Sequence, residues 1–311
     1  MAKRGILLYT TVALTKARLI SLGDLSLMDR EKLEKIIPVI AQKYHFRLEI
    51  IEKDYYLTLI LNSIDAYLSN KIVFKGGTLL NKIHLNYHRL SEDIDFTYLS
   101  NAGLDARSKR SRAITPIREK MPEFLKLLEL KSDKPQGEGF NNSTQYIFNI
   151  SYPSFITGKD ENIELEVSLR QTPIDKPVYN VITHFYNDPF TGEDLIPKNK
   201  ILSLSLNEAV AEKLKAAITR RDVAIRDYYD LWFISEAKFD FKNRQFLSIF
   251  KKKLETEKYK GDYSHNFGLD EKSIELLYRQ IESELMPVIR IGESFDLNEV
   301  LERFNAILQK A

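Results

Sequence analysis

Two aspartates stand two residues apart in the segment Ser91–Phe96, which reads Ser-Glu-Asp-Ile-Asp-Phe. In a β-strand, side chains two apart point the same way, so Asp93 and Asp95 share a face while Ile94 and Phe96 point to the core. Paired carboxylates repel each other unless a cation lies between them, and oxygen ligands suit Mg²⁺, which completes its shell with water and substrate phosphates. Alone, such a pair is common on exposed strands, so its surroundings must decide its role.

A glycine turn precedes the aspartate pair. Gly76, Gly77 and Thr78 separate a short apolar run, Ile72–Phe74, from a helical pattern over Leu79–Leu85. Glycine lets the backbone approach a ligand closely, and a helix N-terminus favours phosphate. An ordinary strand-to-helix turn has the same composition, and the spacing of a P-loop is absent. The turn is therefore a candidate phosphate-binding site only in combination with other elements.

Several basic residues lie near these two segments. Lys82 follows the glycine turn on the same predicted helix, and Arg89 comes just before the aspartate pair. Either side chain could meet a phosphate or remain solvated. The stretch Arg107–Lys120 is basic as well and is a candidate for nucleic-acid contacts, although most charge runs are solvated helix faces.

A third carboxylate is available on a second predicted strand, Ile163–Arg170. Its apolar residues alternate with Glu164, Glu166 and Ser168, which indicates a half-buried strand with an acidic face. We choose Glu166 as the third acid because it is central in the strand. An exposed edge strand of mixed charge has the same pattern.

The fourth element is helical. Lys213 and Arg220 are seven residues apart and share a helical face if the helix is unbroken, and Asp227 and Asp230, three apart, also share a face. Ion pairing on a helix surface would account for both spacings. The pattern gains weight from the glycine turn and the aspartate pair that precede it.

Together these segments resemble the AbiEii/AbiGii family, the nucleotidyltransferase-type toxins of bacterial abortive-infection and toxin–antitoxin systems. The resemblance covers roughly residues 50–235 and is carried by the glycine and aspartate motifs. The matching segments are Ile51–Tyr56, Phe74–Lys82, Arg89–Phe96, Lys213 and Arg226–Leu231.

The resemblance implies roles for these residues in a polymerase-β-like nucleotidyltransferase core. The implied metal ligands are Asp93, Asp95 and Glu166, with Glu164 as the alternative third acid. The implied nucleotide-binding residues are Gly76, Gly77, Thr78, Lys82, Ser91 and Lys213. Asp227 and Asp230 match the helical Arg-Asp-x-x-Asp element of the family, and the sequence leaves open which of the two matters more.

The implied reaction is attack of an acceptor hydroxyl on the α-phosphate of a nucleoside triphosphate, with release of pyrophosphate. Mg²⁺ or Mn²⁺ would supply charge stabilisation and positioning. The family points to RNA as the acceptor, tRNA first, and to a cognate antitoxin. The alternatives are a protein or small-molecule acceptor, or an idle module that binds a nucleotide or a partner. A metal-dependent phosphohydrolase is disfavoured because the chain has only five histidines, none beside an aspartate.

The composition bounds the setting of this chemistry. The 311 residues include 43% hydrophobic residues and no cysteine, which excludes disulfides, thiolate metal sites and a cysteine nucleophile. A net charge of +2 gives no global attraction for a polyanion. The short apolar run within Met1–Leu14 lacks a signal-peptide cleavage site, and no stretch is long enough to cross a membrane, so we expect a cytoplasmic protein.

The elements that position these residues indicate an α+β fold. Strands and helices alternate up to about residue 200, and helices dominate afterwards, which predicts a nucleotidyltransferase core with N-terminal helices over 1–200 and a helical domain over 201–311 that contributes to the cleft. The expected strands are 72–74, 93–99, 145–151 and 163–170, and a loop is expected over 132–143. The expected helices are 29–44, 50–67, 79–85, 108–130, 207–219, 225–237, 243–256, 271–285 and 296–309.

Overall fold

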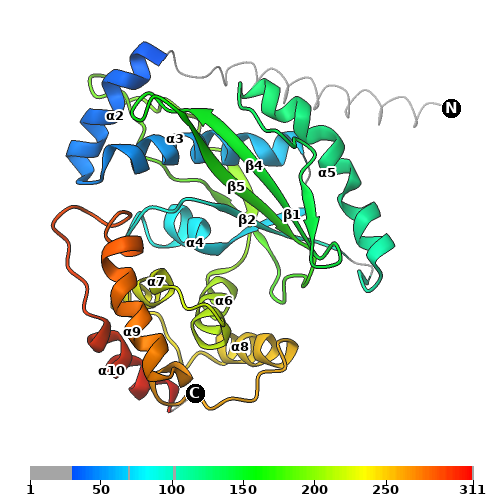
Figure 1. Cartoon of the computed structure of the whole chain (residues 1–311), viewed down its shortest axis with the longest axis vertical. Helices are drawn as coiled ribbons and strands as arrows, with labels where there is room; N and C mark the ends of the chain where they lie inside the picture. Colours follow the sequence, from blue (N-terminus) through cyan, green and yellow to red (C-terminus); the bar gives the residue numbers. More distant parts are fainter. Residues whose placement is uncertain (1–29, 69–70, 101–102, 310–311) are drawn as a thin grey trace, which may run out of the picture.

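The computed structural model describes residues 30–68, 71–100 and 103–309, so Met1–Leu14 and the first residue of the expected helix 29–44 lie outside the described residues. A mixed sheet and the helices around it form one half, and a helical half lies beside them (Figure 1). This confirms the α+β class with a mixed sheet. None of the described helices is both long and apolar enough to cross a membrane. The division at residue 200 stays a prediction.

The sheet has seven strands in the order β3-β4-β5-β2-β1-β7-β6. Its strands are β1 (Ile72–Lys75), β2 (Ile94–Tyr98), β3 (Glu138–Phe140), β4 (Gln145–Pro153), β5 (Asp160–Ser168), β6 (Val178–Val181) and β7 (Lys200–Ser203). The β1–β7 and β2–β5 pairs are parallel and the other four pairs are antiparallel. The two parallel pairs bring β1 and β2, with the glycine turn and the aspartates, to the middle of the sheet.

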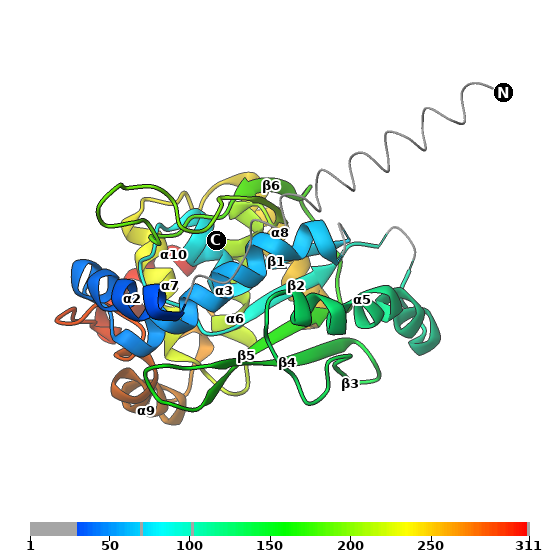
Figure 2. The same ribbon diagram turned by 90° about the horizontal axis from the view of Figure 1, so that it is seen from above.

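The helices divide into two groups around the sheet. The first group is α2 (Arg30–Tyr44), α3 (Leu48–Tyr67), α4 (Gly76–Leu79) with its π-helical continuation η1 (Leu80–His84), and α5 (Arg107–Leu127). The second group is α6 (Leu206–Thr219), α7 (Ile225–Glu236), α8 (Arg244–Thr256), η2 (Asn266–Gly268), α9 (Glu271–Gln280), η3 (Ile281–Leu285) and α10 (Leu297–Leu308). Viewed from above, α3 crosses the sheet and α5 lies at one side (Figure 2).

Local sequence explains where the second group begins. Ser205 is the N-cap of α6, and its hydroxyl accepts the backbone N–H of Glu208, which leaves one fewer unpaired donor at the helix start. Asn243, Asp270 and Asp296 cap α8, α9 and α10 in the same way. These side chains set the starts of four helices that the apolar periodicity alone places only to within a few residues.

Some expected elements differ from the structure. The segment 132–143 is not entirely loop, because Glu138–Phe140 forms β3. Strands β6 and β7 were not expected, since each is only four residues long and they flank a turn-rich segment. The expected helix 29–44 is present as α2, which continues through Pro38 to Tyr44.

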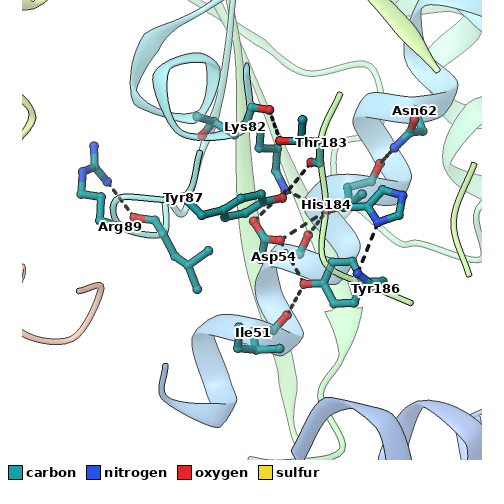
Figure 3. Close-up of polar contacts among 12 residues, drawn as sticks. Ile51, Asp54, Asn62, Lys82, Tyr87, Arg89, Thr183, His184 and Tyr186 are labelled. Atoms are coloured by element: carbon teal, nitrogen blue, oxygen red, sulfur yellow. Dashed lines mark hydrogen bonds and ion pairs between the residues drawn. The ribbon is translucent and has the colours of Figure 1, made fainter. Parts of the chain in front are cut away.

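A buried ion pair joins α3 to the end of the glycine-turn helix. Lys82 Nζ lies 2.7 Å from Asp54 Oδ1, and both side chains are fully buried. Lys82 also donates to the hydroxyls of Thr58 and Tyr87, and the Tyr186 hydroxyl donates to Asp54 Oδ2 at 3.0 Å (Figure 3). Burial lowers the pKa of Lys82, although Asp54 opposes this shift. The pair therefore fixes the helix behind the glycine turn against α3.

Replacing Lys82 by methionine tests this structural role. Lys82→Met leaves the Asp54 carboxylate buried and unpaired, so we expect the free energy of unfolding to fall by about 3–5 kcal/mol. Asp54→Asn combined with Lys82→Met removes both charges and should recover part of the loss. Denaturant unfolding measures both effects, with Lys251→Met on the exposed face of α8 as a control. A loss in Lys82→Met no larger than in the control would contradict the assignment.

Candidate active site

The sheet register places the predicted acids in one row. Asp95 on β2 lies opposite Glu166 on parallel β5 and opposite Lys75 on antiparallel β1. Lys75 Nζ is 3.6 Å from Asp95 Oδ1. Asp93 directly precedes β2 and Glu164 directly precedes Leu165, the partner of Ile94, and the charge of Asp93 acts on Glu164, so the two carboxylates lie near each other. Four carboxylates thus line adjacent positions of two central strands.

The charges of this row act on one another. Loss of hydration, and then the negative charge of Asp95, raise the pKa of Asp93 above its ordinary value. Loss of hydration, Asp93, Glu166 and Asp95 do the same for the pKa of Glu164. Asp93 remains exposed, so a ligand from solvent can reach it. Carboxylates that raise one another's pKa would be stabilised by a bound cation.

The donor set fits a divalent cation shared with a substrate. Within the described part of the chain, no three His, Asp or Glu side chains are arranged as a complete metal site. Mg²⁺ commonly uses only one or two carboxylates and takes further oxygens from phosphates and water. Asp93 and Asp95, exposed and half-buried respectively, can serve as such an incomplete ligand set.

The two glycines make room for side chains of the site. A Cβ built on Gly76, which has φ of +81°, would lie 2.2 Å from Asp95 Oδ2. A Cβ on Gly77 would lie 2.7 Å from Arg89 Nη2 and 3.4 Å from Ser91 Oγ. Both glycines line the cleft. Their lack of a side chain leaves room for the neighbouring residues of the interior, and it would also let a ligand approach the backbone closely.

Lys213 is held by two aspartates of the next helix. Its Nζ lies 2.7 Å from Asp227 Oδ1 and 2.9 Å from Asp230 Oδ2. Arg220 Nη1 is 3.0 Å from Asp227 Oδ2. Burial disfavours the charged amine, but Asp227 and then Asp230 outweigh it and raise the pKa of Lys213. Lys213 is thus a fixed cation whose side chain is 10% exposed, at the wall of the cleft.

Asp230 is itself fixed from the sheet side. Arg89 donates from Nε to Asp230 Oδ1 at 2.6 Å and from Nη2 to Oδ2 at 2.9 Å, and His88 Nε2 lies 2.7 Å from Oδ1. Burial would raise the pKa of Asp230, but Arg89 and Lys213 hold it well below its ordinary value. Asp230 is fully buried, so it positions Lys213 and does not itself face the cleft.

The cleft between sheet and helices is lined by opposite charges. Its volume is about 420 Å³, and five cations and four carboxylates surround it. The cations are Lys75, Arg170, Lys213, Lys215 and Arg220; the carboxylates are Asp95, Glu166, Glu212 and Glu257. Glu212 is half-buried and accepts from Lys253 Nζ at 2.9 Å, which ties this wall to α8. A cation-rich pocket that begins at the carboxylate row can hold a triphosphate and its counter-ion.

Five of the eleven predicted site residues line this cleft: Gly76, Gly77, Asp95, Glu166 and Lys213. Lys82 points into the interior toward Asp54, so its predicted phosphate contact is not supported. Thr78 is buried, and its hydroxyl donates to the Asp93 carbonyl oxygen, so it holds the aspartate strand in place. Ser91 is buried beside Gly77. Thr78 and Ser91 therefore act on a nucleotide only by positioning the residues next to them.

Sequence reasoning missed three cleft cations and misjudged a fourth basic residue. Lys75, Arg170 and Lys215 line the cleft and were not singled out as candidates. Lys75 directly precedes the glycine turn, and that position is the signal that could have identified it. Arg89 was a candidate for phosphate, yet it is buried against Asp230.

Two residues of the basic stretch on α5 bind loop carbonyls. Arg110 is buried and donates to the carbonyl oxygens of Leu104, Asp105 and Asn142. Arg118 donates to the Gln136 carbonyl oxygen. The other four cations of Arg107–Lys120 are exposed, and their contact with nucleic acid stays a prediction.

Comparisons with known proteins identify the family and a similar fold. Residues 59–310 match the model of a family described as nucleotidyl transferase AbiEii toxin, type IV toxin–antitoxin system. MenT4, a nucleotidyltransferase toxin from Mycobacterium tuberculosis, has a similar structure with a TM-score of 0.58 at 15% identity, over 88% of this chain and 90% of MenT4. JHP933 from Helicobacter pylori matches with a TM-score of 0.46 at 16% identity, over 85% and 92% of the two chains. No curated protein matches by sequence.

Substitution of Gly76 separates backbone strain from displacement of Asp95. Gly76→Ala meets both a positive φ and the Asp95 carboxylate, whereas Gly192→Ala meets only a positive φ of +75° with nothing nearby. We expect both variants to lose about 1–2 kcal/mol of stability. Only Gly76→Ala should also lower nucleotidyl transfer, by about 100-fold, because it displaces Asp95, the predicted metal ligand. Equal activities of the two variants at matched folded fractions would refute the role of this glycine.

Proposed function

Because the chain belongs to the AbiEii family of nucleotidyltransferase toxins of type IV toxin–antitoxin systems, we propose that it transfers a nucleoside monophosphate from a nucleoside triphosphate to tRNA. The observation that carries this proposal is the carboxylate row of Asp93 and Asp95 at the edge of a cation-lined cleft. In the reaction, the acceptor hydroxyl oxygen bonds to the α-phosphorus as the bond to the bridging β-oxygen breaks. Pyrophosphate leaves, and the hydroxyl proton passes to solvent.

The cleft supplies the groups that a triphosphate needs. Lys213 is pre-positioned by Asp227 and Asp230, so its ammonium can neutralise phosphate charge without first being ordered. Arg220 and Lys215 add charge on the same helical wall. We assign the β- and γ-phosphates to these three cations and the α-phosphate to the side of Asp95.

Asp93 and Asp95 would hold a divalent cation, Mg²⁺ or Mn²⁺, with Glu166 as the third acid. When bound, such a cation stabilises charge on the transferred phosphate and lowers the pKa of the attacking hydroxyl. Glu166 lies opposite Asp95 and lines the cleft, where Gln145 Nε2 donates to its Oε2 at 2.6 Å. Glu164 is exposed beside Asp93 and is the alternative.

An unpaired RNA end is a suitable acceptor for this reaction. The 2′- and 3′-hydroxyls at a tRNA terminus are reached without flipping a base out of a duplex. We place the reaction in the cytoplasm, where tRNA and nucleoside triphosphates are available. As a toxin of this family, the protein is expected to have a cognate antitoxin.

Label transfer tests the proposed reaction. Incubation with each α-labelled nucleoside triphosphate, Mg²⁺, tRNA and protein extract should label tRNA, and removal of divalent cations by EDTA should end it. Asp93→Ala and Asp95→Ala should each reduce labelling at least about 100-fold. Asp133→Ala is the matched control: it removes an exposed carboxylate from the loop between α5 and β3 and should retain activity. Label in protein or a small molecule instead of tRNA would show that tRNA is not the acceptor. Nucleotide binding with no transfer would indicate an idle module.

The third acid is tested by paired amide variants. Glu166→Gln removes a charge that lines the cleft, and Glu164→Gln removes one beside Asp93 at the exposed end. We expect the Glu166→Gln variant to have the lower kcat and to need more Mg²⁺ for half-maximal rate. The reverse order would assign Glu164 as the third acid.

A further inference from the structure

A three-membered ion cluster lies on the Asp93 side of the carboxylate row. Lys53 Nζ on α3 is 3.6 Å from Glu92 Oε1, and Arg226 Nη1 on α7 is 2.9 Å from Glu92 Oε2. The three side chains are 20%, 29% and 38% exposed for Lys53, Arg226 and Glu92. Both cations also act on Asp93, whose carboxylate they stabilise. The cluster therefore adjoins the reacting centre without lining the triphosphate cleft.

A second cavity opens at this cluster. Its volume is about 420 Å³, and Lys53, Glu92 and Glu161 are among its lining residues. Glu161 lies near the start of β5, whereas Glu166, which lines the triphosphate cleft, lies near its end. Because β2 runs parallel to β5, Glu92 likewise precedes Asp95 along the strand direction. The two cavities thus lie toward opposite ends of the carboxylate row and share no lining residue.

In-line displacement gives the two cavities different roles. The attacking and leaving oxygens lie roughly in line across the transferred phosphorus, so the acceptor must approach from the side opposite pyrophosphate. If the triphosphate occupies the cleft of Lys213, the acceptor hydroxyl arrives from the Asp93 side. The second cavity is the opening on that side.

We propose that Lys53 and Arg226 bind a backbone phosphate of the acceptor RNA, and that Glu92 occupies this phosphate site in the free protein. The proposal rests on the proposed function and names the binding site of its acceptor. The Glu92 carboxylate takes the place that two phosphate oxygens would take between an ammonium and a guanidinium. The guanidinium provides the planar donor pair, and the lysine adds a point charge.

Exchange of Glu92 for a phosphate is energetically accessible. All three side chains contact solvent, and ion pairs of this kind contribute little to stability because water competes for both partners. A polynucleotide phosphate therefore meets cations that are already ordered and needs only to displace one carboxylate. Binding therefore breaks no buried ion pair of the Lys82–Asp54 kind.

The remaining acids of the second cavity limit what enters it. Glu49, Glu52 and Glu161 line the cavity and outnumber its one further cation, the exposed Arg47 at its rim. Glu52 already accepts from the Ser154 hydroxyl at 2.6 Å and the Phe155 N–H at 2.8 Å. Carboxylates repel a further phosphate but accept hydrogen bonds from ribose hydroxyls and exocyclic amines. The cavity thus suits a terminal nucleoside with free hydroxyls, and its single phosphate stays at Lys53 and Arg226.

Acceptor kinetics and binding test the site. We would measure KM for tRNA, KM for the nucleoside triphosphate and kcat, and the salt dependence of tRNA binding by fluorescence anisotropy. Lys53→Gln and Arg226→Gln should each raise KM and Kd for tRNA about tenfold and leave KM for the triphosphate unchanged. Each should also reduce the slope of log K against log salt by about 0.7, the value for one phosphate contact on a single strand. Glu92→Gln should lower KM for tRNA, because a neutral amide replaces the competing carboxylate. The control variant Lys251→Gln, on the exposed face of α8, should change none of these quantities.

The outcomes separate this inference from the proposed function. Suppose that the wild type labels tRNA but Lys53→Gln and Arg226→Gln bind tRNA with unchanged affinity. This result overturns the phosphate site and leaves the proposed function standing. Equal losses of tRNA and triphosphate affinity, or a higher KM for tRNA in Glu92→Gln, indicate a structural cluster and also overturn it. Labelling of protein but not tRNA by the wild type overturns the proposed acceptor and this site together.

Discussion

The bidentate contact between Arg89 and Asp230 is the interaction on which the site depends. Arg89 comes from the segment just before β2 and Asp230 from α7, so this fully buried pair joins the sheet to the helical half. Removal of either partner would leave a buried charge unpaired, which costs far more than loss of a surface pair. Because Asp230 also binds Lys213, the same contact fixes the position of the cleft's central cation.

The glycine turn leaves room for this contact. Gly77 has no side chain where Arg89 passes on its way to Asp230, and Gly76 has none where Asp95 lies. Thr78 then binds the Asp93 carbonyl oxygen, and Lys82 ties the following helix to Asp54. One short segment thus positions the aspartate strand from several sides. Packing around the site accounts for its composition.

The sequence predicted the parts that local chemistry determines. The alternation of apolar and acidic residues placed Asp95 and Glu166 on strands with the correct faces, and spacing placed Lys213 on a helix. Side-chain partners across the fold could not be predicted in this way. Lys82 and Arg89 have the residue types of phosphate ligands, yet buried aspartates on α3 and α7 bind them. Burial and long-range pairing, which depend on the complete fold, decide between these roles.

A crystal structure with Mg²⁺ and a non-hydrolysable nucleoside triphosphate would show directly where the nucleotide and the metal ion bind. We expect the triphosphate between the sheet and α6, with Lys213 and Arg220 on its phosphates. We also expect Asp93 and Asp95 within about 2.1 Å of a metal ion that contacts the α-phosphate. A nucleotide bound elsewhere, or one bound in this cleft without a metal contact from either aspartate, would contradict the proposed site.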